Sequence, residues 1–192
     1  MDGTNREDQS AVSYQRLTER LREAIEQQPW KMTQQLAREC GVPELEVIRA
    51  FPDDRATELA ISGWEDIIRR IVALGAVRVL VSNEAATIEV VGQFGGFSTT
   101  GDFFNVQTGS LDLHIRWREL ASAFAVEKPG HMDGLATYSV QFFNRTGAAA
   151  FKVFLNFGEL LASERLRLFC LLRDEFQATP EVFTSGKSPA AP

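Results

Sequence analysis

A predicted β-hairpin between Tyr138 and Phe157 constrains the fold more than any other stretch of the sequence. Two runs of aromatic and β-branched residues flank Asn144 and Gly147, which favour a turn. Side chains alternate between the two faces of a strand, so one face of the hairpin is strongly apolar. Its members are Tyr138, Val140 and Phe142 in the first strand and Phe151, Val153, Leu155 and Phe157 in the second.

The opposite face of the hairpin is partly apolar too, because it carries Phe143 and Phe154 beside Lys152. Apolar sheet faces in stable domains are packed against another layer. We therefore expect both faces to be covered, and the cover could be helices, a second subunit or a flat hydrophobic ligand.

The apolar periodicity changes along the chain from helical to strand-like near Gly75. Helices are predicted over 12–28, over 33–40 with Thr33 as N-cap, over 43–51 and over 64–74. Strands are predicted over 77–81, 87–91, 103–107, 111–117 and 123–127, followed by the hairpin and a last helix over 159–176. Helices, then strands, then one helix indicate an α+β fold, with a mostly antiparallel sheet flanked by helices.

We predict a single domain over residues 11–178, because 192 residues suffice for one core. It divides into a helical part (11–75), an antiparallel sheet (76–157) and a C-terminal helix (158–178). The polar residues 1–10 and the proline-containing residues 179–192 are predicted to be disordered tails.

The net charge of −6 argues against a nucleic-acid-binding protein, which needs a basic surface. The spacing of Ala37, Gly41 and Val47 imitates a helix-turn-helix. However, the segment that would enter the major groove holds two acids and a single arginine, Arg49, so it would repel phosphates. We expect no nucleic-acid partner, and interpret these helices as a cap on the sheet.

The two cysteines, Cys40 and Cys170, lie far apart and lack metal-ligand spacing. The first residues are polar, unlike a secretory signal, and no apolar run approaches the length of a membrane span. These features favour a cytoplasmic protein without a membrane partner.

Two histidines limit any histidine chemistry, and His114 lies in the predicted strand 111–117. Alternation places Asp112, Arg116 and Arg118 on the same face as His114. By default such a row is a solvated sheet face. It would also suit an iron porphyrin, whose metal takes an imidazole and whose propionates take arginine. His131 follows a Lys-Pro-Gly sequence and is predicted to lie in a loop.

Several stretches resemble the HutX/ChuX family of cytosolic haem-utilisation carriers, which is related to the HemS/ChuS haem proteins. They are Gly96–Val106, Leu113–Ile115, Phe142–Gly147, Lys152–Leu155 and the helical lead-in Val47–Pro52. The resemblance implies an α+β fold and a homodimer whose subunits mimic the two repeats of the larger proteins. It also implies a carrier, not an enzyme, that binds haem and passes it to a haem-degrading partner.

The residues that bind haem in this family match only in part. Ser98–Thr100 stand where the family is His-rich, and Phe103 stands at or next to a tyrosine position. Of the usual candidates His114 is present, so the resemblance makes it the iron ligand, with His131 or Tyr138 as alternatives.

Other residues complete the predicted site. Arg116 or Arg118 would pair with a propionate, and Phe103 and Phe104 would sandwich the ring. The alternative is a protein of the same fold that has lost haem and binds another apolar ligand or a partner protein. A haem-degrading enzyme is disfavoured, because two histidines leave little to build an oxygen-activating site.

Overall fold

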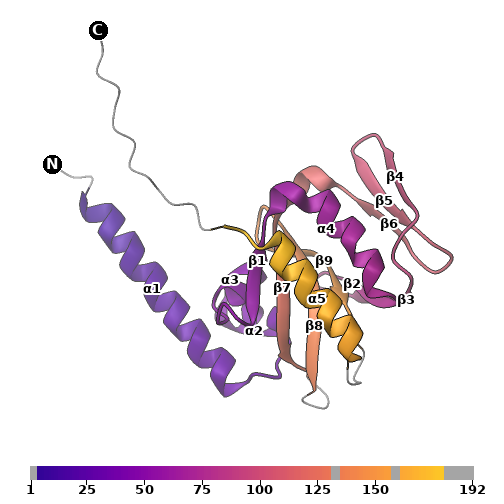
Figure 1. Ribbon diagram of the computed structural model, residues 1–192. Coiled ribbons are helices and arrows are strands. Elements are labelled where there is room, and N and C mark those ends of the chain that lie inside the picture. The colour runs from indigo at the N-terminus through magenta and orange to yellow at the C-terminus, as the bar shows by residue number, and fades with distance from the viewer. Residues whose placement is uncertain (1–3, 131–134, 157–160, 180–192) are drawn as a thin grey trace, which may run out of the picture.

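The computed structural model describes residues 4–130, 135–156 and 161–179, and it confirms an α+β fold built on antiparallel sheets (Figure 1). A large six-stranded sheet has the order β1-β7-β8-β9-β2-β3, and a small three-stranded sheet has the order β4-β5-β6. The strands of the large sheet are β1 (Ala56–Leu59), β2 (Val77–Ser82), β3 (Thr87–Gly92), β7 (Leu120–Pro129), β8 (Ala136–Asn144) and β9 (Ala149–Phe154). Those of the small sheet are β4 (Phe97–Thr100), β5 (Phe103–Gln107) and β6 (Asp112–Ile115).

The helices flank the large sheet on both sides (Figure 1). Three precede it: α1 (Thr4–Gln27), α2 (Thr33–Cys40) and α3 (Glu44–Arg49). The remaining ones are α4 (Trp64–Arg70), α5 (Ser163–Phe176) and the short 3-10 helices η1 (Ile61–Gly63), η2 (Ile71–Leu74) and η3 (Trp117–Glu119). None of the described helices combines the length and apolar character needed to cross a bilayer.

The predicted hairpin is formed by β8 and β9, which pair antiparallel. Asn144 starts the turn as expected, since its side-chain oxygen accepts hydrogen bonds from the backbone N–H groups of Thr146 and Ala148. Gly147 has φ +78°, a conformation that side chains disfavour. Phe157 lies outside the described residues.

The two faces of the large sheet bury two separate apolar clusters. The first face packs against α4, η2 and α5, through side chains such as Phe142, Val153 and Phe169. The second face packs against α1, α2 and α3 through Phe124 and Phe143. The predicted division of the hairpin into two apolar faces is therefore confirmed, and helices lie over both.

The helical cover of the second face is incomplete. The cluster under α1–α3 draws its sheet residues mainly from β1, β7 and β8. The side chains that β2, β3 and β9 present to the same face line a cavity instead. Helices α1–α3 thus cover one part of this sheet face, and the cavity lies beside them over the uncovered part.

Several boundaries differ from the sequence predictions. Helix α1 begins at Thr4, so it includes residues that composition predicted to be disordered. Thr33 is the first helical residue of α2, and the N-cap is Met32. Strands β1 and β4 were not predicted, because four-residue strands carry too few alternations to be recognised.

The strands predicted over 103–107 and 111–117 form a separate sheet with β4, not part of the large one. Gly96 explains how β4 folds back closely, because a Cβ there would lie 1.8 Å from the carbonyl oxygen of Gln107. The predicted strand over 111–117 ends at Ile115, and Trp117 opens η3. Arg118 therefore does not continue the row of side chains on β6.

Gly147→Ala should destabilise the fold by about 2–4 kcal/mol, from left-handed backbone strain and overpacking. The added Cβ would lie 2.8 Å from the Cβ of Pro43, and Leu45 N–H already donates to the Gly147 carbonyl. Urea unfolding measures the change. Gly109→Ala is the control, since no atom lies within 4 Å of its Cβ position. Equal stability of the two variants would contradict the argument.

Candidate ligand-binding site

His114 lies on the outer face of the small sheet, opposite Asn105 on β5. Its Nδ1 lies 2.7 Å from the Asn105 side-chain oxygen, and its Nε2 lies 3.3 Å from a carboxylate oxygen of Asp112. The side chain is half exposed. Both ring nitrogens are therefore engaged, and an iron atom would have to displace Asp112 to reach Nε2.

Two of the other predicted site residues do gather around His114. The ring of Phe103 meets the imidazole edge-on at 6.2 Å, and the Arg116 guanidinium lies 5.3 Å from the centre of the same ring. Phe103, His114 and Arg116 thus form an open polar face with one aromatic side chain.

Phe104 does not belong to this group, which corrects the prediction that it sandwiches a ligand together with Phe103. Consecutive residues of a strand point to opposite faces, so Phe104 points into the core and is 1% exposed. It stacks on Phe97 at 5.5 Å and meets Trp64 edge-on at 5.2 Å. His131 lies outside the described residues.

The alternative ligand Tyr138 lies on the α5 side of the large sheet, 5.5 Å from the ring of Phe169. Burial raises the pKa of its phenol, and the nearby carboxylate of Glu127 raises it further. A tyrosine binds ferric iron as a phenolate, so this environment works against that role.

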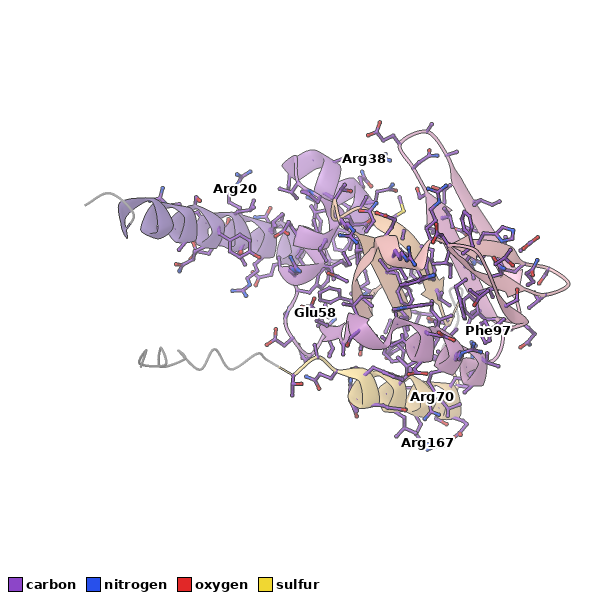
Figure 2. The ribbon with its side chains drawn as sticks, turned by 90° about the horizontal axis from the view of Figure 1, so that it is seen from above. Arg20, Arg38, Glu58, Arg70, Phe97 and Arg167 are labelled. Carbon is purple, nitrogen blue, oxygen red and sulfur yellow. The ribbon has the colours of Figure 1, made fainter. Side chains whose placement is uncertain are left out.

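A cavity of about 790 Å³ lies between α2 and the exposed part of the large sheet. None of His114, Arg116, Phe103 and Phe104 lines it. Figure 2 shows Arg38 on α2 and Phe97 on the small sheet in different parts of the molecule, which illustrates the separation of the two regions. The sheet side of the cavity includes the apolar residues Leu80, Ala149 and Phe154 and the charged residues Arg78, Glu89 and Lys152.

A buried ion pair joins the helical wall of the cavity to its sheet wall. The ammonium group of Lys152 on β9 contacts the carboxylate of Glu44 at the start of α3. Thr33 on α2 donates its hydroxyl to the same carboxylate and accepts a bond of 3.3 Å from Lys152. Both charged side chains are at most 9% exposed, so each depends on the other for compensation.

Lys128 supplies a second cation to the cavity. Burial, and to a smaller extent the positive charge of Lys152, together lower the pKa of its amine to about 8. Its Nζ donates a hydrogen bond of 2.7 Å to the carbonyl of Pro129. An ammonium held in such a desolvated position is ready to receive an anionic group of a ligand.

Gln141 also lines the cavity, and the hydrogen-bonding capacity of its side chain is only partly satisfied. Its amide nitrogen donates to the Ser139 hydroxyl at 3.0 Å, whereas its buried amide oxygen has no hydrogen-bond partner among the residues that the structure describes. Buried polar groups are rarely left unpaired, and one costs about 1–3 kcal/mol. The fold therefore keeps an unsatisfied hydrogen-bond acceptor in the cavity wall, at a cost that an apolar residue would avoid.

Among the residues that the structure describes, four cations and three acids line the cavity. Glu89 pairs with Arg78 at 2.8 Å, and Glu44 pairs with Lys152. Arg38 donates to the backbone carbonyl of Asn83 at 3.2 Å. Together with the apolar side chains of Leu80, Ala149 and Phe154, these charged groups suit a flat apolar ligand that carries carboxylates.

The sequence contains a signal for this cavity in the second strand of the hairpin. Alternation already placed Lys152 and Phe154 on the second face of the hairpin. A lysine in an otherwise apolar strand interior indicates a buried partner or a ligand. Its partner Glu44 is 108 residues away, so only the tertiary structure reveals the pair.

The structure is therefore that of an α+β protein with a lined cavity on one face of an antiparallel sheet. The family described as the Haemin-degrading HemS.ChuX domain matches residues 41–165, and the chain belongs to this family.

Individual relatives are distant in sequence. The intracellular heme transport protein HutX of Vibrio cholerae is 23% identical over 141 residues, which cover 72% of each chain. A protein from Erwinia carotovora has a similar structure, with a TM-score of 0.75 and 26% identity over 82% of this chain and 98% of that one. The heme binding protein ChuX gives a TM-score of 0.71 and 25% identity, covering 81% of this chain and 97% of the other.

A protein described as an enzyme has a similar fold. The Escherichia coli O157:H7 heme degrading enzyme ChuS has a TM-score of 0.70 and 23% identity over 86% of this chain. The match spans 47% of the ChuS chain.

Glu44→Ala should destabilise the protein by about 3–5 kcal/mol, because Lys152 would be left as an uncompensated buried charge. The double variant Glu44→Leu with Lys152→Met should lose much less, since no buried charge remains. Chemical unfolding of all three proteins measures this. Glu65→Ala, which breaks an exposed pair with Arg69, is the control and should cost about 0.5 kcal/mol. A double variant less stable than Glu44→Ala would contradict the prediction.

Lys128→Met should raise the free energy of unfolding at pH 7 by about 1–2 kcal/mol, since it removes a desolvated charge. The folded-state pKa of about 8 lies below the ordinary 10.5. Between these values the unfolded chain binds more protons, so wild-type stability rises with pH in this window. The advantage of the variant should therefore shrink from pH 7 to pH 10. Urea unfolding at both pH values tests this, and an unchanged difference would refute it.

Proposed function

We propose that this chain is a haem-binding carrier whose cargo lies in the cavity between α2 and the large sheet. The observation that carries the proposal is the cation-lined, partly apolar cavity beside the buried Lys152–Glu44 pair. Family membership supports haem as the cargo, and ChuX and HutX are described as a heme binding and a heme transport protein.

The cavity matches haem in size, in apolar surface and in charge. Its volume of about 790 Å³ lies within the usual range for cofactor-sized ligands. Leu80 and Phe154 offer apolar surface to the ring. Lys128 and Arg38 offer cations to the propionates, since neither is consumed by a carboxylate in the pairs described above.

The outer face of the small sheet remains a second candidate location, because Phe103, His114 and Arg116 lie together there. There His114 would ligate the iron and Arg116 would pair with a propionate, as the sequence predicted. This face offers one aromatic ring and is open to solvent, so it would cover less of the ligand than the cavity does.

The proposal includes a homodimer in the cytoplasm that hands its haem to a haem-degrading enzyme. The chain itself acts as a carrier and performs no chemistry on the ring. If haem does not bind, the same cavity serves another apolar carboxylate, which is the alternative from the sequence. Loss of bound haem absorbance with ascorbate and oxygen, with release of an open-chain product, would instead support an enzyme.

A hemin titration of the purified protein should show a Soret band that saturates near one haem per subunit. Lys128→Met and Arg38→Met should each weaken binding about tenfold, because each removes a charge-assisted contact to a propionate. His114→Ala should leave the affinity within about twofold.

Arg167→Met is the matched control for loss of positive charge. This arginine lies on the exposed side of α5, and Figure 2 shows it on the opposite side of the molecule from Arg38. Circular dichroism confirms that each variant is folded. Binding lost in His114→Ala and retained in Lys128→Met would move the site to the small sheet. Absence of a saturable band would refute haem binding.

A further inference from the structure

Met32 occupies a position that the fold does not explain. It is the N-cap of α2, and its side chain makes no capping hydrogen bond. Serine, threonine, aspartate and asparagine are preferred at this position, and a residue without a capping oxygen costs about 1 kcal/mol. Met32 is 52% exposed, so its apolar side chain contributes little to the core.

The backbone around Met32 is nevertheless held firmly. Its carbonyl accepts a hydrogen bond of 3.0 Å from Leu36 N–H in the first turn of α2. On one side, Lys31 bonds to Gln28 at 2.8 Å and pairs with Glu39. On the other side, Thr33 is fixed in the buried cluster with Lys152. A side chain on a fixed backbone at the edge of a cavity is preorganised to contact a ligand there.

Met32 also lines the cavity. Among the described residues of the cavity wall, its thioether is the sole sulfur, and no imidazole, thiol or phenol accompanies it. Methionine sulfur is a soft donor that serves as an axial ligand of haem iron in other proteins. Local sequence rules are often broken where function requires it, and a methionine in place of a capping residue is such a case.

We propose that Met32 is an axial ligand of the iron when haem occupies the cavity. The step is coordination alone: a lone pair of Sδ forms a bond to iron, with no electron or proton transferred. The inference rests on the proposed function, because it needs haem in this cavity. It assigns the metal contact to the helical wall, whereas Lys128 and Arg38 hold the carboxylates.

A single weak bond of this kind suits a carrier, which must release its cargo. Ferrous iron is softer than ferric iron and should therefore bind the thioether more tightly. Reduction of bound haem would then strengthen the contact with Met32, so wild type should hold ferrous haem more tightly than a variant without sulfur.

The test compares wild type with Met32→Leu, which keeps the size and apolarity of the side chain but removes the sulfur. Each protein is titrated with hemin, with dithionite-reduced haem and with metal-free protoporphyrin IX. Met32→Leu should weaken the binding of reduced haem about tenfold or more and change the absorption and magnetic circular dichroism spectra of the bound haem. Metal-free porphyrin should bind both proteins within about twofold.

Two further variants sharpen the result. Met32→His should tighten hemin binding relative to wild type, because imidazole is the stronger ligand of ferric iron. Trp30→Leu is the matched control, since this neighbouring side chain is equally exposed but does not line the cavity. It should leave all three affinities unchanged.

The possible failures are distinct. Identical haem spectra in wild type and Met32→Leu would overturn the assignment of Met32 and leave haem binding in place. A loss of affinity for metal-free porphyrin equal to that for haem would reduce Met32 to an apolar contact and also overturn it. Failure of every porphyrin to bind wild type would instead refute the proposed function itself.

Discussion

The buried contact between Lys152 and Glu44 is the interaction on which the arrangement of the cavity depends. It ties the start of α3 to β9, and Thr33 adds α2 to the same cluster. Removing two charges from water is costly, so their geometry tolerates little movement. An apolar pair would stabilise the helical cap equally well. The ion pair instead keeps a cation in the wall of a cavity beside Lys128, where an anionic ligand can benefit from it.

The large sheet uses its two faces for different purposes. On the α5 side, Phe142 and Phe151 stack within the first apolar cluster, 4.6 Å between ring centres. On the other side, α1–α3 cover β1, β7 and β8 and leave part of the sheet exposed. The unpaired oxygen of Gln141 and the lowered pKa of Lys128 both occur on this side. The packed core and the cavity thus lie on opposite faces of one sheet.

Family membership agrees with the fold more closely than with the predicted haem ligands. The matching stretch Phe142–Gly147 contains the hairpin turn, whose glycine packs against Pro43 and so positions α3. His114, selected from the sequence as the iron ligand, lies on the small sheet with both nitrogens occupied. The fold agrees better than the ligands because the short resembling stretches consist mainly of turn and core residues. The resemblance does not establish which of the remaining polar side chains face the ligand.

Alternation and turn chemistry were sufficient to predict the hairpin, its two apolar faces and the α+β order of elements. These are local properties, since they depend on neighbours within a few residues. The same alternation placed Arg116 on the face of His114, and it also shows why Phe104 could not share a face with Phe103. The position of Phe104 in the core follows from the period of a strand. Four-residue strands such as β1 and β4 stayed below what periodicity can detect.

The sequence by itself determined which residues each strand presents to which face, including Lys152 on the second face of the hairpin. Only the tertiary structure decided what stands opposite that lysine. Glu44, Thr33 and Met32 reach the cavity from helices more than 100 residues away along the chain. No local pattern encodes such a meeting, because it arises from how α1–α3 pack on β7 and β8. The cavity lies over the part of the sheet that this packing leaves uncovered.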